Sequence, residues 1–266
     1  MTQPVLFSDY ALSQRLERAE GLANAAFVEA RGNGARWIDV SGTYAMFDTP
    51  YSPVTQTFGL GMFGEVGAAD LDRIEEFFTG LGAHIHHEIS PLADASVWPL
   101  IAARRYEAFE FTSILCLDLK NAALPEVPRT SGMTVRLAVA DEAEVYAQTM
   151  TVGWGLPAES DDTFMQTSFL TKGVSSFLVE KDGQPVATGA LNIQNGVALL
   201  AGASTVPEAR RQGAQRLLLA ARLRYAVEAG CEIAAMGALP GSESQRNAQR
   251  AGFQIAYTRT KWRYRV

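Results

Sequence analysis

Apolar and polar residues follow two different periods in the second half of the chain. A period of two marks residues 176–181, 185–193 and 197–206 as strands, with an Asp-Gly and an Asn-Gly turn pair between them. After Pro207 the period lengthens to that of a helix, which ends at Gly230. One face of this helix is apolar: Leu217, Leu218, Ala221 and Tyr225. The pattern predicts an antiparallel meander followed by a helix.

The flanking segments extend this pattern into a complete α/β layout. Strand 133–137 and helices 141–151 and 163–170 precede the meander, and strand 231–236, helix 242–251 and strand 253–257 follow the long helix. Strands alternating with helices in this way predict a mixed, mostly antiparallel sheet flanked by helices.

The first half of the chain repeats the same order of elements. The pattern predicts strands 37–46 and 55–63, helix 68–81, strand 84–89, helix 95–104 and strand 107–119. Pro125 and Pro128 lie in a polar stretch between the halves, which predicts a linker at 123–132. We therefore expect two domains, residues 1–122 and 133–266, related by a diverged duplication.

Charge is distributed unevenly along the 266 residues. Residues 203–266 hold 11 Lys and Arg against four Asp and Glu, whereas residues 1–202 hold 12 against 25. A basic C-terminal segment in an acidic chain favours a small phosphorylated ligand over a long polyanion. No apolar run is long enough to span a membrane, and the N-terminus has no signal-like layout, so we expect a cytoplasmic protein. Cys116 and Cys231 lie in apolar runs, which is typical of buried thiols.

An arginine-rich turn joins predicted strand 197–206 to the long helix. Arg210, Arg211 and Arg216 surround Gly213 where that helix begins. The first turn of a helix presents free backbone N–H groups and the positive end of the helix dipole, and arginine matches phosphate oxygens. The turn therefore predicts a phosphate or pyrophosphate site. The alternative is a solvated helix start whose arginines face water.

The order of elements around this turn resembles the GNAT superfamily of acyl-CoA-dependent N-acetyltransferases. The family's turn reads Gln/Arg-x-x-Gly-x-Gly/Ala with a proline three positions earlier, and Pro207, Arg210 and Gly213 match it. Gly252 and Phe253 match the Gly-Phe pair that ends the family's next helix. The resemblance implies a GNAT domain with an acetyl-CoA site in the second half. The first half then corresponds to a degenerate GNAT-like domain without the CoA motif.

The resemblance also assigns cofactor-binding residues, in which the strand meets the pantetheine arm and the turn holds the pyrophosphate. These residues are Ala203, Ser204, Thr205, Arg210, Arg211, Gln212, Gly213, Ala214, Gln215, Arg216, Ser244 and Asn247. Gln215 departs from the family pattern because a small residue is usual there. Ser244 and Asn247 share one face of predicted helix 242–251. The alternative for that helix is that Ser242 or Ser244 caps it and the other polar residues are only solvated.

Direct acyl transfer needs an oxyanion donor, a base for the amine and an acid for the thiolate. The expected oxyanion donor is a backbone amide near Thr205 or Val206, and the candidate catalytic acids are Ser244 and Tyr257. Ala248 stands where the family often has a tyrosine acid, and water is the alternative proton source. The strand carries no carboxylate, so the base has to come from elsewhere.

All three histidines lie in predicted strand 84–89. His84, His86 and Glu88 would share one face of this strand, and His87 would lie on the other. The cluster permits a polar strand face, a base donated by the first domain, or a metal site. Two histidines and one carboxylate on a single strand lack a further metal ligand, so we expect no metal.

The expected fold class is α/β (α+β), with two GNAT-like domains. The expected function is acetyl transfer from acetyl-CoA to a primary amine of a small molecule or peptide, and the alternative is an inactive acyl-CoA-binding or sensing protein. The basic run Arg259, Lys261, Arg263 and Arg265 alternates with Trp262 and Tyr264. Such alternation is typical of an edge strand, which disfavours a nucleic-acid partner. The expected partners are acetyl-CoA and the amine acceptor, and a homodimer is the assembly left open.

Overall fold

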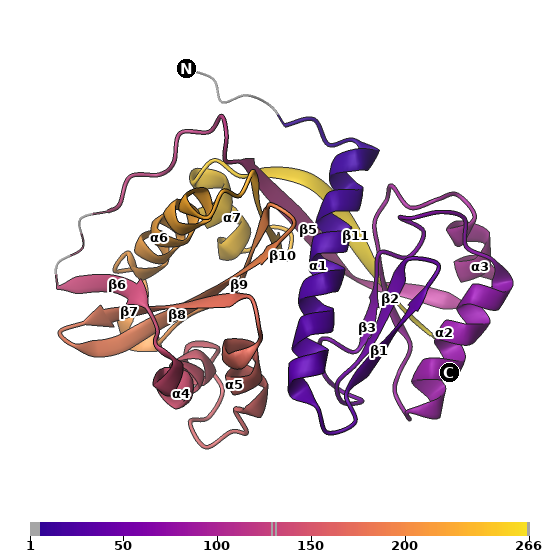
Figure 1. Cartoon of the computed structure of the whole chain (residues 1–266), viewed down its shortest axis with the longest axis horizontal. Coiled ribbons are helices and arrows are strands. Elements are labelled where there is room, and N and C mark those ends of the chain that lie inside the picture. Colours follow the sequence, from indigo (N-terminus) through magenta and orange to yellow (C-terminus); the bar gives the residue numbers. More distant parts are fainter. Residues whose placement is uncertain (1–5, 129, 131, 265–266) are drawn as a thin grey trace. The chain divides into compact units, whose positions relative to one another are not determined.

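The computed structural model describes residues 6–128, 130 and 132–264, which form two compact units (Figure 1). Unit 1 comprises residues 116–236 and 247–253, and unit 2 comprises residues 6–115, 237–246 and 254–264. The last strand of the chain thus belongs to the unit that contains most of its first half. No helix in the described ranges is long and apolar enough to cross a membrane.

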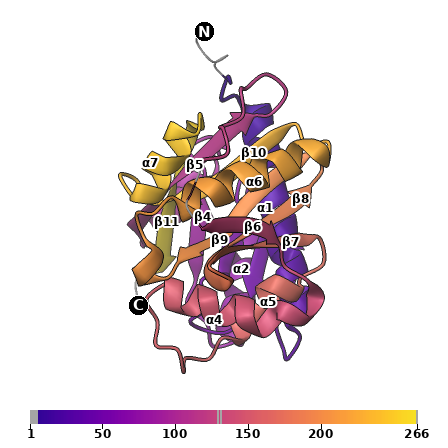
Figure 2. The ribbon, with the colours of Figure 1, turned by 90° about the vertical axis from the view of Figure 1, so that its left-hand side faces the viewer.

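Unit 1 contains the meander and the long helix. Its elements are β6 (Met133–Leu137), a 3₁₀ turn (Ala140–Glu142), α4 (Ala143–Gly153), α5 (Thr163–Leu170), β7 (Val174–Lys181), β8 (Gln184–Gln194), β9 (Val197–Thr205), a second 3₁₀ turn (Pro207–Ala209), α6 (Ala214–Glu228) and β10 (Ile233–Ala238), whose last two residues belong to unit 2. Strands β6 to β9 pair antiparallel, and β10 pairs parallel to β9 after the α6 crossover. Helix α6 covers one face of β7–β9, and α4 and α5 cover the other (Figures 1 and 2).

Local sequence explains most of unit 1. Asp182 and Gly183 have φ angles of 52° and 78°, and Asn195 and Gly196 have 49° and 77°, so both predicted turn pairs adopt the left-handed backbone that tight hairpins need. Leu217 and Leu218 of α6 are buried as predicted. Each contributes roughly 1.5–3 kcal/mol by leaving water.

Unit 2 begins with helix α1 (Tyr10–Arg31), which the sequence pattern did not predict. Its elements are α1 (Tyr10–Arg31), β1 (Arg36–Val40), β2 (Thr43–Phe47), β3 (Gln56–Phe58), α2 (Ala68–Gly80), β4 (His86–Ile89), α3 (Val97–Ala103), β5 (Tyr106–Asp118), α7 (Glu243–Arg250) and β11 (Gln254–Tyr264), of which β5 and α7 also extend into unit 1. The strand order in this unit is β1-β2-β3-β4-β11-β5. The fold class is therefore the predicted one, a mixed α/β structure with a mostly antiparallel sheet.

Three predictions for unit 2 were wrong. Predicted strand 37–46 is a hairpin, β1 and β2, which turns at Ser41 and Gly42 with φ angles of 53° and 83°. Predicted strand 55–63 shortens to β3. The C-terminal strand is not an edge strand, because β11 lies between β4 and β5. Of its basic residues, Arg265 lies outside the described residues and Arg259 is buried.

Candidate functional site

Helix α6 begins without a side-chain cap. Gly213 is its N-cap residue, with a φ of 96° in the left-handed region that favours glycine, and the first turn of the helix contains no acidic residue. The N–H groups of Arg216 and Leu217 both return to the Gly213 carbonyl at 3.0 Å. The positive end of the helix is thus not neutralised by any carboxylate of its own first turn.

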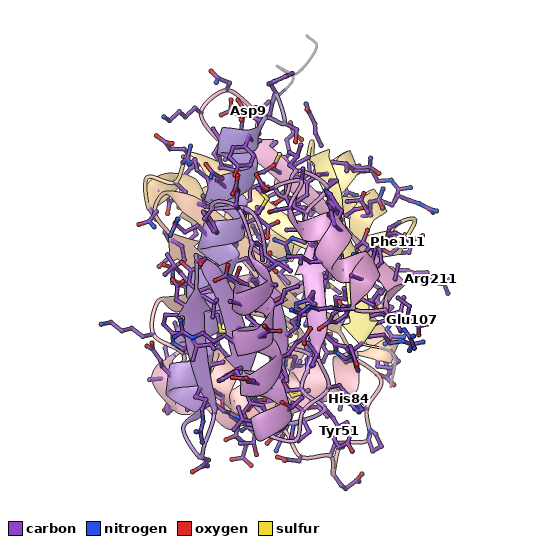
Figure 3. The ribbon with its side chains drawn as sticks, turned by 90° about the vertical axis from the view of Figure 1, so that its right-hand side faces the viewer. Asp9, Tyr51, His84, Glu107, Phe111 and Arg211 are labelled. Atoms are coloured by element: carbon purple, nitrogen blue, oxygen red, sulfur yellow. The ribbon has the colours of Figure 1, made fainter. Side chains whose placement is uncertain are left out.

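The three arginines of the turn have different environments. Arg211 and Arg216 are exposed, and Arg211 has a left-handed φ of 61°, which costs a non-glycine residue about 1 kcal/mol (Figure 3). Arg210 instead holds the turn together: its Nε donates to the Thr205 carbonyl and its Nη2 to the Gly153 carbonyl, both at 3.1 Å. All three arginines are exposed, but Arg210 is the one that is bonded to backbone carbonyls of unit 1.

The two glutamines of the turn are bonded within unit 1. Gln215 donates from Nε2 to the Ser204 carbonyl and to Thr205 Oγ1, both at 2.7 Å. Its side chain thus lies across the end of β9, which is how this larger residue fits a position where the family usually has a small one. Gln212 Oε1 accepts a hydrogen bond from Lys181 Nζ at 2.8 Å. Ala214 is buried at the start of α6.

Strands β9 and β10 pair over only part of their length. Their register runs from Val197↔Ile233 to Leu199↔Ala235, and the rest of β9 has no register with β10. In this unpaired part, β9 bulges against β8: Thr188 faces Ser204 and Ala190 faces Ala201, which leaves two β9 residues opposite one β8 residue. The bulge contains Gly202, with a left-handed φ of 62°.

The bulge turns two backbone N–H groups away from β8. The Gly202 carbonyl accepts a hydrogen bond from Thr188 Oγ1 at 3.2 Å, and the Ala201 carbonyl accepts one from Arg222, which also bonds the Ala190 carbonyl of β8. In a trans peptide the N–H points opposite to the carbonyl. The N–H groups of Gly202 and Ala203 therefore point to the side of β9 that β10 does not pair.

The N–H of Val206, one of the two expected oxyanion donors, donates to the Val186 carbonyl at 3.0 Å and is therefore already bonded within unit 1. Trp154, at the C-terminal end of α4, donates from its indole to the Ala203 carbonyl at 3.4 Å and is about half exposed. The indole thus lies against β9 where the bulge ends.

Helix α7 carries the remaining predicted cofactor residues. Ser244 is exposed and Asn247 is half-buried one turn later. Ser242 Oγ, not Ser244, accepts the hydrogen bond from the Gln245 N–H at 3.2 Å, so Ser242 caps the helix. Ala248 is buried. The structure leaves the Ser244 side chain at the surface of the helix and assigns it no partner among the described residues.

The hydroxyl of Tyr257 is hydrogen-bonded to a buried carboxylate. Tyr257 lies in β11 of unit 2, where its Oη donates to Glu17 Oε1 at 2.8 Å, and both side chains are buried. Burial and the neighbouring Glu17 carboxylate raise the pKa of Tyr257 well above its ordinary value. Arg259 Nε donates to the same carboxylate oxygen at 2.7 Å. A hydroxyl held in this way is a poor proton donor to a thiolate, which weakens Tyr257 as a catalytic acid.

Strand β4 begins at His86, so His84 lies outside the strand that was expected to span residues 84–89. His87 is fully buried against Tyr106, and its Nδ1 lies 2.9 Å from Thr57 Oγ1. Burial lowers the pKa of His87 to about 3, so the ring is neutral and inaccessible to an external amine. Glu88 faces Gln56 and Arg259. No cluster of three His, Cys, Asp or Glu residues suited to a metal occurs in the described ranges. Cys116 and Cys231 are buried free thiols, as predicted.

The turn, the helix start and the bulge all lie in a segment that matches a known family. Residues 141–253 match the Acetyltransferase (GNAT) family. This segment of the chain is therefore similar to the GNAT acetyltransferases. No curated protein sequence matches it.

Solved structures extend the likeness of fold to nearly the whole chain. A GCN5-related N-acetyltransferase from Kribbella flavida has a TM-score of 0.68 and 20% identity, over 92% of this chain and 95% of its own. A GCN5-related N-acetyltransferase from Sphaerobacter thermophilus has a TM-score of 0.62 and 14% identity, over 98% of this chain and 93% of its own. A tandem GNAT protein from the clavulanic acid biosynthesis pathway has a TM-score of 0.59 and 13% identity, over 97% of this chain and 96% of its own. At these identities the likeness establishes the GNAT fold.

Proposed function

We propose that unit 1 binds acetyl-CoA and that the protein transfers its acetyl group to a primary amine of a small molecule or peptide. The observation that carries the proposal is the start of α6, which has no side-chain cap and is flanked by the exposed Arg211 and Arg216, whereas the third exposed arginine, Arg210, bonds backbone carbonyls. Two arginines and the positive end of a helix dipole suit a pyrophosphate, whose two adjacent phosphate groups each carry negative charge.

The unpaired edge of β9 supports the second part of the site. An extended pantetheine arm carries amide groups that bond to a free strand edge as another strand would. The Gly202 and Ala203 N–H groups face this edge and are the proposed oxyanion donors for the thioester carbonyl. The amine nitrogen would attack the carbonyl carbon and lose a proton to water, the C–S bond would break, and the thiolate would take a proton from water.

A second candidate function is binding of acyl-CoA without turnover. Ala248 occupies the position of the family's tyrosine acid, and no carboxylate occurs in β9. Both features remove groups that direct transfer usually employs. This candidate predicts the same affinity for acetyl-CoA but no chemistry with amines.

The test has two stages. Calorimetric titration with acetyl-CoA and CoA measures binding, and release of the CoA thiol in the presence of a library of primary amines measures transfer. Binding together with amine-dependent thiol release supports the enzyme. Binding without thiol release above the rate of hydrolysis supports the binding protein, and absence of binding would contradict both.

A further inference from the structure

One arginine of unit 1 is buried without a carboxylate. Arg222 lies in α6 and is 4% exposed. Among the described residues it has no ion pair, and the only ionisable group that acts on it is Tyr146. A buried cation with no counter-charge is costly unless its surroundings use the charge. Burial lowers the pKa of Arg222 to about 10, so the guanidinium is still charged at neutral pH.

The guanidinium is bonded to the bulge of β9. Arg222 Nη1 donates to the Ala190 carbonyl at 3.1 Å and to the Ala201 carbonyl at 3.3 Å. Gly189 makes this approach possible, because a Cβ atom there would lie 3.1 Å from Arg222 Cζ. The absence of a side chain on β8 thus lets a charged group from α6 reach the backbone of both strands.

The opposite face of the bulge is closed by α4. A Cβ atom on Gly202 would lie 3.2 Å from Met150 Cε and 3.5 Å from Tyr146 Oη. Tyr146 and Met150 are both almost completely buried. Water is therefore kept from this side of the peptide, and the field of a nearby cation is stronger in such surroundings than in water.

We propose that Arg222 is a positioning residue that polarises the Ala201–Gly202 peptide and so strengthens the Gly202 N–H as a donor to the thioester carbonyl oxygen of acetyl-CoA. This inference rests on the proposed function of unit 1. A cation bonded to a peptide carbonyl draws electron density from the N–H of the same peptide, as in other chains of hydrogen bonds. The effect grows as attack by the amine places negative charge on the carbonyl oxygen.

The test is the infrared stretching frequency of the acetyl carbonyl of bound acetyl-CoA, recorded with an isotope label on that carbonyl. It needs no acceptor amine. Three variants separate charge from hydrogen bonding: Arg222→Lys keeps the charge, Arg222→Gln keeps a donor without charge, and Arg222→Met keeps neither. Calorimetry gives the acetyl-CoA affinity of each, and circular dichroism shows that each is folded.

The expected result is a lower carbonyl frequency in the bound wild-type complex than in free acetyl-CoA. This shift is largely kept in Arg222→Lys, smaller in Arg222→Gln and smallest in Arg222→Met, at similar affinity. With an acceptor amine, Arg222→Gln lowers kcat about tenfold at an unchanged KM for acetyl-CoA. If Arg222→Met does not fold, the Lys and Gln variants carry the comparison.

Two results would overturn the inference and leave the proposed function standing. One is a wild-type complex that binds acetyl-CoA without a shift of the carbonyl frequency. The other is the same shift in all folded variants, which would make Arg222 a structural residue. If wild-type protein does not bind acetyl-CoA, the proposed function fails and the role of Arg222 fails with it.

Discussion

Two helices of this protein, α6 in unit 1 and α2 in unit 2, begin at a glycine but have opposite electrostatics at that end. At α2, the Asp70 carboxylate accepts the Gly67 N–H at 2.8 Å and the Ser41 hydroxyl at 3.0 Å. Glu65 precedes that start, whereas Arg211 precedes the start of α6. The start of α2 supplies its own anion, and the start of α6 is left to an external one. A helix N-terminus becomes a candidate site only where the chain does not neutralise it.

The two buried arginines, one in each unit, differ in the groups that surround their charge. Arg259 in unit 2 is 1% exposed and pairs with Glu17 at 2.7 Å and Glu20 at 2.6 Å. Arg222 in unit 1 is bonded to peptide carbonyls instead. The buried arginine of unit 2 is balanced by carboxylates, whereas the buried arginine of unit 1 is bonded only to peptide carbonyls.

The largest expected effect is on stability and comes from Arg259→Met. This change leaves Glu17 buried without its cation, and removal of one partner of a buried pair costs about 3–5 kcal/mol. Arg222→Met leaves no carboxylate behind and should lower the free energy of unfolding by less. Urea denaturation followed by circular dichroism measures both losses. Equal losses would break the comparison of the two arginines.

Gly213→Asp should weaken acetyl-CoA binding on the order of 100-fold, because a carboxylate would face the pyrophosphate at short range. The matched control is Gly213→Asn, which has the same size and the same left-handed backbone requirement at φ 96° but no charge. Calorimetric titration gives the dissociation constant of acetyl-CoA for each variant. A similar loss of affinity in both would show that backbone strain, and not charge, is responsible.

Arg216→Glu should weaken acetyl-CoA binding by about tenfold, since an exposed cation next to the phosphates is replaced by an anion. Arg224→Glu is the control, because Arg224 is exposed on the same helix but lies two turns further on. The difference between the two should shrink as the salt concentration rises. Equal effects at low salt would mean that only the net charge of the protein matters.

Asp70→Ala should lower the free energy of unfolding by about 1 kcal/mol, the usual cost of a lost helix cap. Its acetyl-CoA affinity should equal that of the wild type. Glu76→Ala removes the same charge from an exposed position further along α2 and should cost less. Altered affinity in Asp70→Ala alone would assign the start of α2 a part in binding.

The smallest expected effect is that of Gln215→Ala. The Gln215 amide occupies the Ser204 carbonyl, so its removal should free that group and tighten acetyl-CoA binding by about threefold. Gln212→Ala, in which the lost side chain is bonded to Lys181, should leave the affinity unchanged. Weaker binding by Gln215→Ala would indicate that Gln215 contacts the ligand directly.

The fold of unit 1 could be predicted because its signals are local. Turn pairs such as Asn195-Gly196 fix the strand ends, and strand alternation fixes the faces. Helix α1 could not be predicted in the same way. Its buried face includes Ser13, Glu17 and Gly21, and Glu17 is buried only because Arg259, 242 residues later, pairs with it. No pattern within α1 reports a partner so distant in the sequence.

The candidate site could be predicted in part. The position of the turn could be predicted from Gly213 and the arginines. Which arginine bonds the backbone could not be predicted, because the bond from Arg210 to the Gly153 carbonyl joins segments that are distant in the sequence. Arg222 gave a signal that was missed. It follows Leu218 by four residues, so it lies on the buried face of α6 rather than on the solvent face.

The most direct test of the central claim is the backbone amide NMR spectrum of the protein during titration with CoA. The account predicts shifts for the amides of residues 211–216 at the start of α6 and for Gly202 and Ala203 in β9. It predicts no shifts for residues 64–70 at the start of α2. Shifts confined to the start of α2, or none at either helix start, would contradict it.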